Sequence, residues 1–171
     1  MVEFPVNPTR FDPYKNTKFH VKWDGVVVPG VTKVGPLQRH TGVVLNREGG
    51  DPSLERHSLG TTSFASVLLA RGRTQDQMFE QWANKVFNVG SPPGQEVSLK
   101  DFRKDVRIEL LNEAEQIVLA HNLLRCWPSF YQPLSELDAN GGGIALESMI
   151  LECESWQRDV AVVEPVEPKT G

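Results

Sequence analysis

The chain has 171 residues, of which 39% are hydrophobic and 23% are charged, and its formal net charge is -4. This composition is ordinary for a soluble globular protein and lies far from the disordered class, so we expect one domain over residues 1–171. The net negative charge argues against general affinity for nucleic acid, which depends on neutralising phosphates with lysine and arginine. No apolar run approaches the roughly 20 residues that span a bilayer, and the N-terminus has no apolar signal core.

The first part of the chain predicts an arm followed by a hairpin. Three prolines among residues 1–16 remove amide donors and hold the backbone away from regular structure, which predicts an extended N-terminal arm. Apolar and polar residues then alternate over residues 17–23, and this period of two indicates a half-buried strand. Asp24 and Gly25 favour a two-residue hairpin turn, because both of its central positions need positive φ. Residues 26–28 are therefore expected to return as the partner strand.

A long polar stretch between two apolar runs is the most unusual feature of the sequence. Residues 31–45 alternate loosely and end in one apolar run, and residues 64–70 form another. The polar face of residues 38–47 fits either a channel lining or any solvent-facing strand. Residues 46–62 are too polar to bury and too rich in glycine to be helical, so we expect a loop. A loop of this length is normally functional or disordered, and our hypothesis is a docking surface on an assembly protein.

Residues 74–88 give the one convincing helical pattern. Thr74 and Gln77 have the spacing of a capping box, and Gly90 with the prolines after it should end the helix. Four apolar residues fall at i, i+3, i+4 and i+7, so we expect this face to pack against a sheet rather than to bind a cofactor. The packing residues are Phe79, Trp82, Ala83 and Val86.

A further hairpin is predicted after the helix. Residues 105–110 alternate as one strand, a turn follows at Asn112 and Glu113, and residues 117–124 return as the second strand. We expect that strand to end at Cys126-Trp127-Pro128, because proline ends most central strands. Residues 130–134 then read as a short link.

The last third of the chain predicts one loop, one strand and one arm. Residues 138–143 are rich in Asn and Gly and favour a turn, and residues 144–154 favour a final long strand. Residues 160–171 are acidic and rich in proline, so we expect a C-terminal arm that is frayed or lies on a neighbour. One helix among about eight strands indicates a mainly β sandwich or barrel with the helix on its flank.

The sequence predicts no catalytic, cofactor or metal site. The histidines and cysteines lack metal-ligand spacing, and no glycine-rich phosphate loop or nucleophile motif is present. Glu147, Glu152 and Glu154 suggest a carboxylate pair, but on a final strand they more simply form a solvated face. Two free buried thiols are the expected state of Cys126 and Cys153, and one disulfide is left open by the sequence.

The sequence carries more docking features than a lone domain needs. Two proline-rich arms and a long charged loop would all be explained by a cyclic homo-oligomer. Pairing of sheet edges between identical subunits would also hide those edges. A monomer with unordered ends remains the alternative reading.

Short segments spread over nearly the whole chain occur in an order and spacing that is more specific than any single motif. These segments are Asp12-Pro13-Tyr14-Lys15-Asn16, Phe19-His20-Val21, Gly30-Val31 with Val34, Arg47-Glu48-Gly49-Gly50, Leu69-Ala70-Arg71-Gly72, Trp82, Asn112-Glu113-Ala114, Cys126-Trp127-Pro128, Asp138-Ala139-Asn140, and Glu147 with Leu151 and Glu152. Together they resemble the T4-type phage tail tube family, and most of all the inner tube proteins of contractile injection systems and phage-tail-like particles.

The resemblance implies a fold similar to that of the type VI secretion inner tube protein. This fold is mainly β, with two antiparallel sheets packed as a sandwich or barrel and one flanking α-helix. The resemblance also implies hexameric rings that stack into a hollow tube. The implied partners are further copies of the chain, a surrounding sheath, baseplate or terminal tube proteins, and DNA or effector cargo that crosses the lumen without specific binding. The implied location is a virion tail or a tail-like particle assembled in the bacterial cytoplasm.

The resemblance gives residues 46–62 the role of an inter-ring stacking loop. Two positions depart from the family pattern: Leu59 stands where proline is frequent, and Glu115 stands where glycine is common. The first departure could loosen the stacking loop, and the second alters a hairpin turn. The residues to which the resemblance assigns stacking contacts are Arg47, Glu48, Gly49, Gly50, Asp51, Pro52, Ser53, Glu55, Arg56, His57 and Gly60.

The function implied for the chain is therefore that of a non-enzymatic tube subunit, driven through a target envelope by sheath contraction. The close alternative is a terminal or tube-initiating protein of the same particle. A stand-alone monomeric β binding module and a hydrolase on a β-barrel scaffold are the alternatives from other classes.

Overall fold

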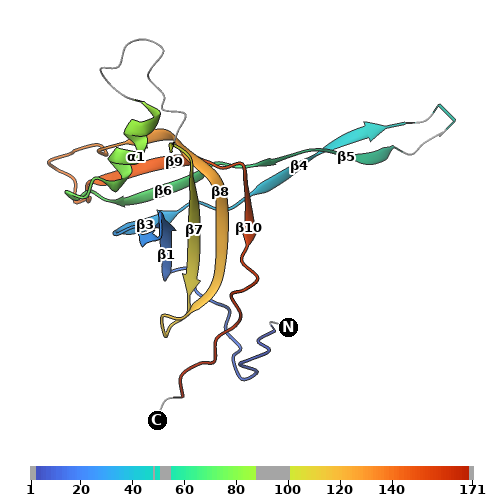
Figure 1. Cartoon of the computed structure of the whole chain (residues 1–171), viewed down its shortest axis with the longest axis horizontal. Helices are drawn as coiled ribbons and strands as arrows, with labels where there is room; N and C mark the ends of the chain where they lie inside the picture. Colours follow the sequence, from blue (N-terminus) through green and yellow to red (C-terminus); the bar gives the residue numbers. More distant parts are fainter. Residues whose placement is uncertain (1–2, 48, 51–54, 88–100, 170–171) are drawn as a thin grey trace.

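The structure is a computed structural model that describes residues 3–47, 49–50, 55–87 and 101–169 (Figure 1). Within these residues the chain forms ten β-strands and one α-helix. In chain order the elements are β1 (Phe19–Trp23), β2 (Val26–Val27), β3 (Val31–Val34), β4 (Arg39–Asn46), β5 (Arg56–Phe64), β6 (Val67–Gly72), α1 (Met78–Val86), β7 (Lys104–Leu111), β8 (Ile117–Gln132), β9 (Leu146–Glu152) and β10 (Ser155–Arg158).

Strand β8 joins two antiparallel sheets. Its first half pairs with β7 and β10, whereas its second half, from Trp127 onward, pairs with β9. Sheet 1 therefore has the order β2-β1-β7-β8-β10, and sheet 2 has the order β8-β9-β6-β3. The strands of the two sheets cross at a steep angle in Figure 1, with α1 beside sheet 2. The predicted fold class, two antiparallel sheets with one flanking helix, is confirmed.

The first hairpin follows the sequence pattern closely. Val21 and Trp23 are buried while His20 is exposed, as the alternation predicts. Asp24 and Gly25 both have positive φ, 53° and 76°, and they join β1 to β2. The turn prediction is confirmed because it depended on local backbone chemistry alone.

The predicted end of β8 at Pro128 is wrong. The strand continues to Gln132 and takes in most of the segment that the sequence suggested as a short link. Beyond Cys126 this strand has lost its β7 partner and forms the edge of sheet 2, and its register with β9 shifts between Pro128 and Phe130. An edge next to a register irregularity tolerates the missing amide of proline.

The predicted final strand over residues 144–154 is present but shorter, because it is β9, Leu146–Glu152. β9 ends at Glu152, and β10, which sequence reasoning missed, begins at Ser155 and pairs with the first half of β8. The chain thus passes from sheet 2 to sheet 1 within two residues. Likewise, the loosely alternating residues 31–45 divide into β3 and β4.

Helix α1 begins four residues later than predicted, at Met78 rather than at Thr74. The predicted capping box between Thr74 and Gln77 is wrong, because the Gln77 N-cap makes no side-chain capping bond. Arg71 binds both the carboxylate and the carbonyl oxygen of Asp76, and Asp76 in turn accepts a hydrogen bond from the Met78 N–H. These bonds hold the residues before Met78 outside the helix. The helix ends at Val86, two residues before the predicted end, and Phe87 after it is extended. Gly90, the predicted stop signal, lies outside the described residues.

The core lies between the two sheets and under α1. The Trp23 ring packs at centroid distances of 4.9 Å from Trp82 and 5.7 Å from Phe79, and the Trp82 indole N–H donates to the Phe102 carbonyl at 2.7 Å. The single helix of the described residues is too short and too polar to span a membrane. The buried core residues are Val21, Trp23, Val28, Val67, Leu69, Phe79, Trp82, Val106, Leu123, Cys126, Met149 and Leu151.

Candidate functional site

Strands β4 and β5 form a two-stranded hairpin, and β5 lies where the sequence predicted a loop. Their pairing runs from Arg39 opposite Phe64 to Asn46 opposite Arg56. The predicted loop over residues 46–62 is therefore wrong in its extent, since β5 begins at Arg56. The polar residues of β5 look like a loop because both faces of this strand meet solvent, so no alternation marks it.

The hairpin projects away from both sheets in Figure 1. Its strands pack mainly with each other, and β5 makes a small contact with β10. Several apolar side chains are nonetheless exposed on it, with Val43 60%, Val44 52%, Leu45 59% and Leu59 90% accessible. Val43 lies opposite Leu59 across the hairpin, so the exposed apolar residues of the two strands are adjacent. Val44, between Val43 and Leu45 on β4, lies on the opposite face of the hairpin. We call Val43, Leu45 and Leu59, which share one face, the hairpin patch.

Those residues predicted for the stacking loop that the structure describes lie in or next to the strands of this hairpin. Arg56, His57 and Gly60 are part of β5, while Gly49 and Gly50 form a turn. Arg47 and Glu55 flank the two strands and are exposed. The remaining predicted residues, Glu48, Asp51, Pro52 and Ser53, lie outside the described residues.

Gly60 allows the two strands to approach closely near the middle of the hairpin. A Cβ at this position would lie 2.8 Å from the Gly42 carbonyl oxygen, which is closer than carbon and oxygen can pack. The register of the hairpin shifts between Thr41 and Val43 at the same level. The glycine pair therefore marks a bulge that bends the hairpin.

An aromatic cluster holds the base of the hairpin to sheet 1. Trp156 of β10 packs edge-on against Phe64 of β5 and against His121 of β8, each at a centroid distance of 5.7 Å. Burial, together with the positive charge of Arg158, lowers the pKa of His121 from its ordinary value. The imidazole is therefore neutral at neutral pH and packs as an aromatic ring.

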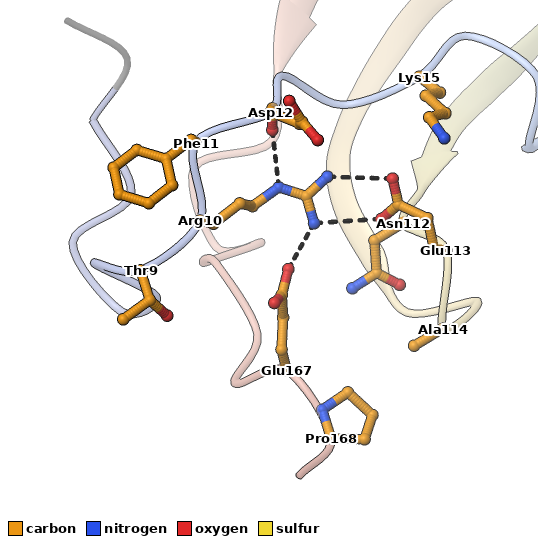
Figure 2. A pocket seen from close by; sticks show the side chains of 10 residues that line it. All are labelled: Thr9, Arg10, Phe11, Asp12, Lys15, Asn112, Glu113, Ala114, Glu167 and Pro168. Atoms are coloured by element: carbon orange, nitrogen blue, oxygen red, sulfur yellow. Dashed lines mark hydrogen bonds and ion pairs between the residues drawn. The ribbon is translucent and has the colours of Figure 1, made fainter. Parts of the chain in front are cut away.

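The two terminal arms bind each other through Arg10. Figure 2 shows its guanidinium between Glu113, in the β7–β8 turn, and Glu167 of the C-terminal arm. The Arg10 Nε also donates to the Asp12 carbonyl at 2.9 Å. The Arg10 guanidinium lies 4.7 Å from the Tyr14 ring centroid, a cation–π distance. The Glu113 and Glu167 hydrogen bonds raise the pKa of Arg10 further above its ordinary value.

A second set of bonds joins the arms beside Arg10. The Asn7 side-chain amide donates to the Glu164 carboxylate at 2.7 Å and to the Pro165 carbonyl at 2.8 Å, and the Glu167 N–H donates back to the Asn7 amide oxygen at 3.0 Å. The C-terminal arm thus lies on the chain's own N-terminal arm. Sequence reasoning missed these partners, because the N-terminal arm has as many acidic as basic residues and so gives no charge signal for its partner.

Glu147 is buried rather than part of a solvated face, so that prediction is wrong. Its carboxylate, with no exposed surface, accepts from Arg71 Nε at 2.7 Å, Arg73 Nη1 at 2.6 Å and the Tyr131 hydroxyl at 2.7 Å. Burial and the hydrogen bond to Glu147 raise the pKa of Tyr131 to about 12. The network is fully paired and supports the start of α1 through Asp76. Glu152 is half-buried and Glu154 is exposed.

The helix residues predicted to pack lie on one face of α1. Phe79, Trp82 and Ala83 are buried and Val86 is half-buried. The Arg71 guanidinium lies 4.3 Å from the Phe79 ring centroid, which ties this face to the Glu147 network. Among the described residues, no cluster of three or more His, Cys, Asp or Glu side chains could hold a metal ion.

Comparison with known proteins gives one family and a consistent set of structures. The family described as T4-like virus tail tube protein gp19 matches residues 15–157. No significant match was found among curated protein sequences.

Three solved structures illustrate the similarity of fold. A chain of the anti-feeding prophage baseplate is similar with a TM-score of 0.70 and 19% identity, covering 87% of this chain and 97% of that one. A chain of the sheath-tube complex of an extracellular contractile injection system, in the extended state, has a TM-score of 0.69 and 20% identity. The match covers 86% of this chain and 91% of that one. A chain of the anti-feeding prophage tube-terminating cap has a TM-score of 0.73 and 19% identity. The match covers 88% of this chain and 93% of that one.

Proposed function

The chain belongs to the T4-like virus tail tube protein family, and from this premise we propose that it is the inner tube subunit of a contractile injection system or contractile phage tail. Six copies form a ring, and rings stack into a hollow tube. Contraction of a surrounding sheath drives the tube through a target envelope, and the lumen conducts DNA or effector protein. The subunit's role is mechanical and involves no catalysis. The particle assembles in the bacterial cytoplasm.

The observation that carries this proposal is the exposed hairpin patch. An isolated two-stranded hairpin is at best marginally stable in water, and here its apolar residues face solvent, with Leu59 90% accessible. Covering such side chains contributes about 25 cal/mol per Å² of apolar surface buried. In a stack of identical rings, each hairpin meets the same surface of the next ring, so one head-to-tail contact repeats along the tube. The polar residues predicted for stacking, including Arg56 and His57, flank the patch.

Sheet edges supply the contacts within a ring. Sheet 2 ends at β3 on one side and at the second half of β8 on the other. Unpaired strand edges readily pair with another chain, and a closed ring removes them. Six copies of sheet 2, joined edge to edge, would form one continuous barrel around the lumen.

The outer face of sheet 2 suits the wall of such a lumen. Across β6 and β9, Leu68 lies opposite Ile150 and Ala70 lies opposite Ser148 on this face. Lys33, opposite Ala70, and Glu152 of β9 add one charge of each sign to this face. The wall it forms would therefore carry no net positive charge to trap an anionic cargo. DNA or an acidic effector would therefore pass without specific binding.

A second candidate function is that of a terminal or tube-initiating protein of the same particle. The fold similarity to a tube-terminating cap chain favours this candidate as much as the similarity to a sheath-tube chain favours the first. The two candidates differ in the number of rings that form. A main tube subunit stacks into long tubes, whereas a terminal protein stops at one or two rings and binds baseplate or cap proteins instead.

The experiment that tests the proposal removes the hairpin patch. We expect Val43→Ser combined with Leu59→Ser to leave a folded subunit that forms rings but not stacks, as seen by negative-stain electron microscopy. Leu137→Ser is the matched control, because Leu137 is 69% exposed but lies in the loop between β8 and β9. Tubes of normal length from the double variant would contradict the stacking role. Short stacks of uniform height from the wild-type protein would favour the terminal candidate.

A further inference from the structure

We infer that Cys126 and Cys153 form a disulfide site that locks the junction between the two sheets when the protein meets a small-molecule disulfide. The two thiols are free in the structure, and their Sγ atoms lie 2.7 Å apart. The inference is independent of the tube function, because it depends on the fold of one subunit.

The strand register places the two cysteines directly opposite each other. Trp127 pairs with Glu152 on one side of them, and Leu124 pairs with Ser155 on the other, so the same register brings Cys126 opposite Cys153. Directly opposite residues of antiparallel strands have Cα atoms about 4.5–5.5 Å apart, within the range of about 4.4–6.8 Å that disulfides require. Bond formation therefore needs no rearrangement of the backbone.

The site lies where the chain twice crosses between the sheets. Cys126 follows Arg125, whose φ of 53° bends β8 between sheet 1 and sheet 2. Cys153 lies in the two-residue link by which the chain leaves β9 in sheet 2 and enters β10 in sheet 1. A bond between the two sulfur atoms would fasten both crossings at one point.

Burial assigns a different role to each thiol. Cys126 has no exposed surface, whereas Cys153 is half-buried and so can be reached by a small reagent. The hydrogen bond with Cys153, together with burial, raises the pKa of Cys126 and keeps it protonated at neutral pH. The first attack therefore comes from Cys153, and Cys126 acts as the resolving thiol.

The reaction is an exchange of disulfides. The Cys153 thiolate attacks one sulfur of the small disulfide, a mixed disulfide forms, and one small thiolate leaves. The Cys126 thiol then gives up its proton and attacks the Cys153 sulfur, the mixed S–S bond breaks, and the second small thiolate leaves and takes up a proton. In sum, two protein thiols are oxidised to one disulfide, and the small disulfide is reduced to two thiols.

The test treats the full-length protein with oxidised glutathione and compares it with the same protein kept in reductant. We expect intact mass to fall by two hydrogen atoms with no glutathione adduct. Peptide mapping without reductant should give one linked peptide that contains Cys126 and Cys153. The bond closes a loop across 27 residues, so we expect Tm to rise by roughly 5–10 °C.

Two variants separate the steps. Cys126→Ala keeps the core apolar and should stop the reaction at a single glutathione adduct on Cys153. Cys153→Ser should take up no glutathione at the buried Cys126 and should show no rise in Tm. Unchanged mass in the wild-type protein, a lasting glutathione adduct on it, or a cross-link between two chains would each overturn the inference.

Discussion

Single residues of this protein show how distant partners permit a charge to be buried. Glu109 on β7 is 2% exposed, yet Lys22 and Arg107 lie at 2.8 Å from its two carboxylate oxygens. Glu147 is likewise buried between Arg71 and Arg73. The partners lie up to 87 residues away in sequence, so alternation along one strand could not predict them. A buried carboxylate of this kind needs its partners to be stable.

The first prediction concerns how Glu109 makes the stability of the fold depend on pH. Burial by itself raises the pKa of Glu109, but the hydrogen bonds and charges of Lys22 and Arg107 outweigh it and hold the pKa below its ordinary value of 4.5. The unfolded chain therefore binds the proton first as pH falls. The stability that ionised Glu109 contributes is present above about pH 4.5 and is lost as pH falls through the lower folded-state pKa.

Urea unfolding of the wild type and of Glu109→Gln over a range of pH measures this contribution. We expect the difference in unfolding free energy to be constant near neutral pH and to shrink below about pH 4. Glu136→Gln removes an exposed glutamate and should show no such pH dependence. A difference in unfolding free energy that stays constant into strong acid would contradict the pairing of Glu109 with Lys22 and Arg107.

A second prediction at this scale concerns Glu115 in the turn between β7 and β8. Its φ is 64°, in the left-handed region that costs a non-glycine residue about 1–2 kcal/mol. Its ion pair with Lys18 is exposed and contributes little. We expect Glu115→Gly to raise Tm by about 2–4 °C in differential scanning calorimetry. Ala114→Gly, which meets no such strain, should not raise Tm, and equal effects of both changes would refute the explanation.

At the scale of elements, the hairpin of β4 and β5 is what the sequence could least specify. The strand pattern of β1 and the turn at Asp24 are local and could be predicted, because one face of that strand is buried. β5 has no buried face, so its polar residues read as a loop. The continuation of β8 past Pro128 could not be predicted for a different reason. Proline is tolerated there because this half of β8 is a sheet edge, and only the sheet topology shows that.

The third prediction belongs to the hairpin. In Gly60→Ala the new methyl group would collide with the Gly42 carbonyl, so the two strands must separate near their bulge. We expect amide hydrogen exchange in β4 and β5 to speed up by at least about 10-fold, while Tm of the body changes little, because the hairpin lies outside the core.

Gly49→Ala is the matched control for this substitution. A Cβ at Gly49 would meet nothing within 4 Å, so exchange in the hairpin should stay at the wild-type rate. If amide hydrogen exchange in β4 and β5 stayed slow in Gly60→Ala, the close approach of the two strands would not be what stabilises the hairpin.

At the scale of the whole molecule, the two arms are paired with each other, whereas the β4–β5 hairpin and the edges of sheet 2 have no partner strand within the described residues. The C-terminal arm, which the sequence predicted to be frayed or to lie on a neighbour, is ordered against the N-terminal arm through Arg10 and Asn7. The hairpin, in contrast, keeps an apolar patch open to solvent. The family and the fold class could be predicted from short segments in order, whereas the paired arms and the free hairpin depend on contacts between distant parts of the chain. Among the described residues, the surfaces that we propose for assembly are the hairpin and the edges of sheet 2.

The central claim is that identical copies of this chain form rings that stack. Negative-stain electron microscopy of the purified wild-type protein, with two-dimensional class averages of end-on and side views, tests it most directly. We predict six-fold rings end-on and tubes of uniform diameter from the side. Featureless monomeric particles that persist at high protein concentration would contradict the claim.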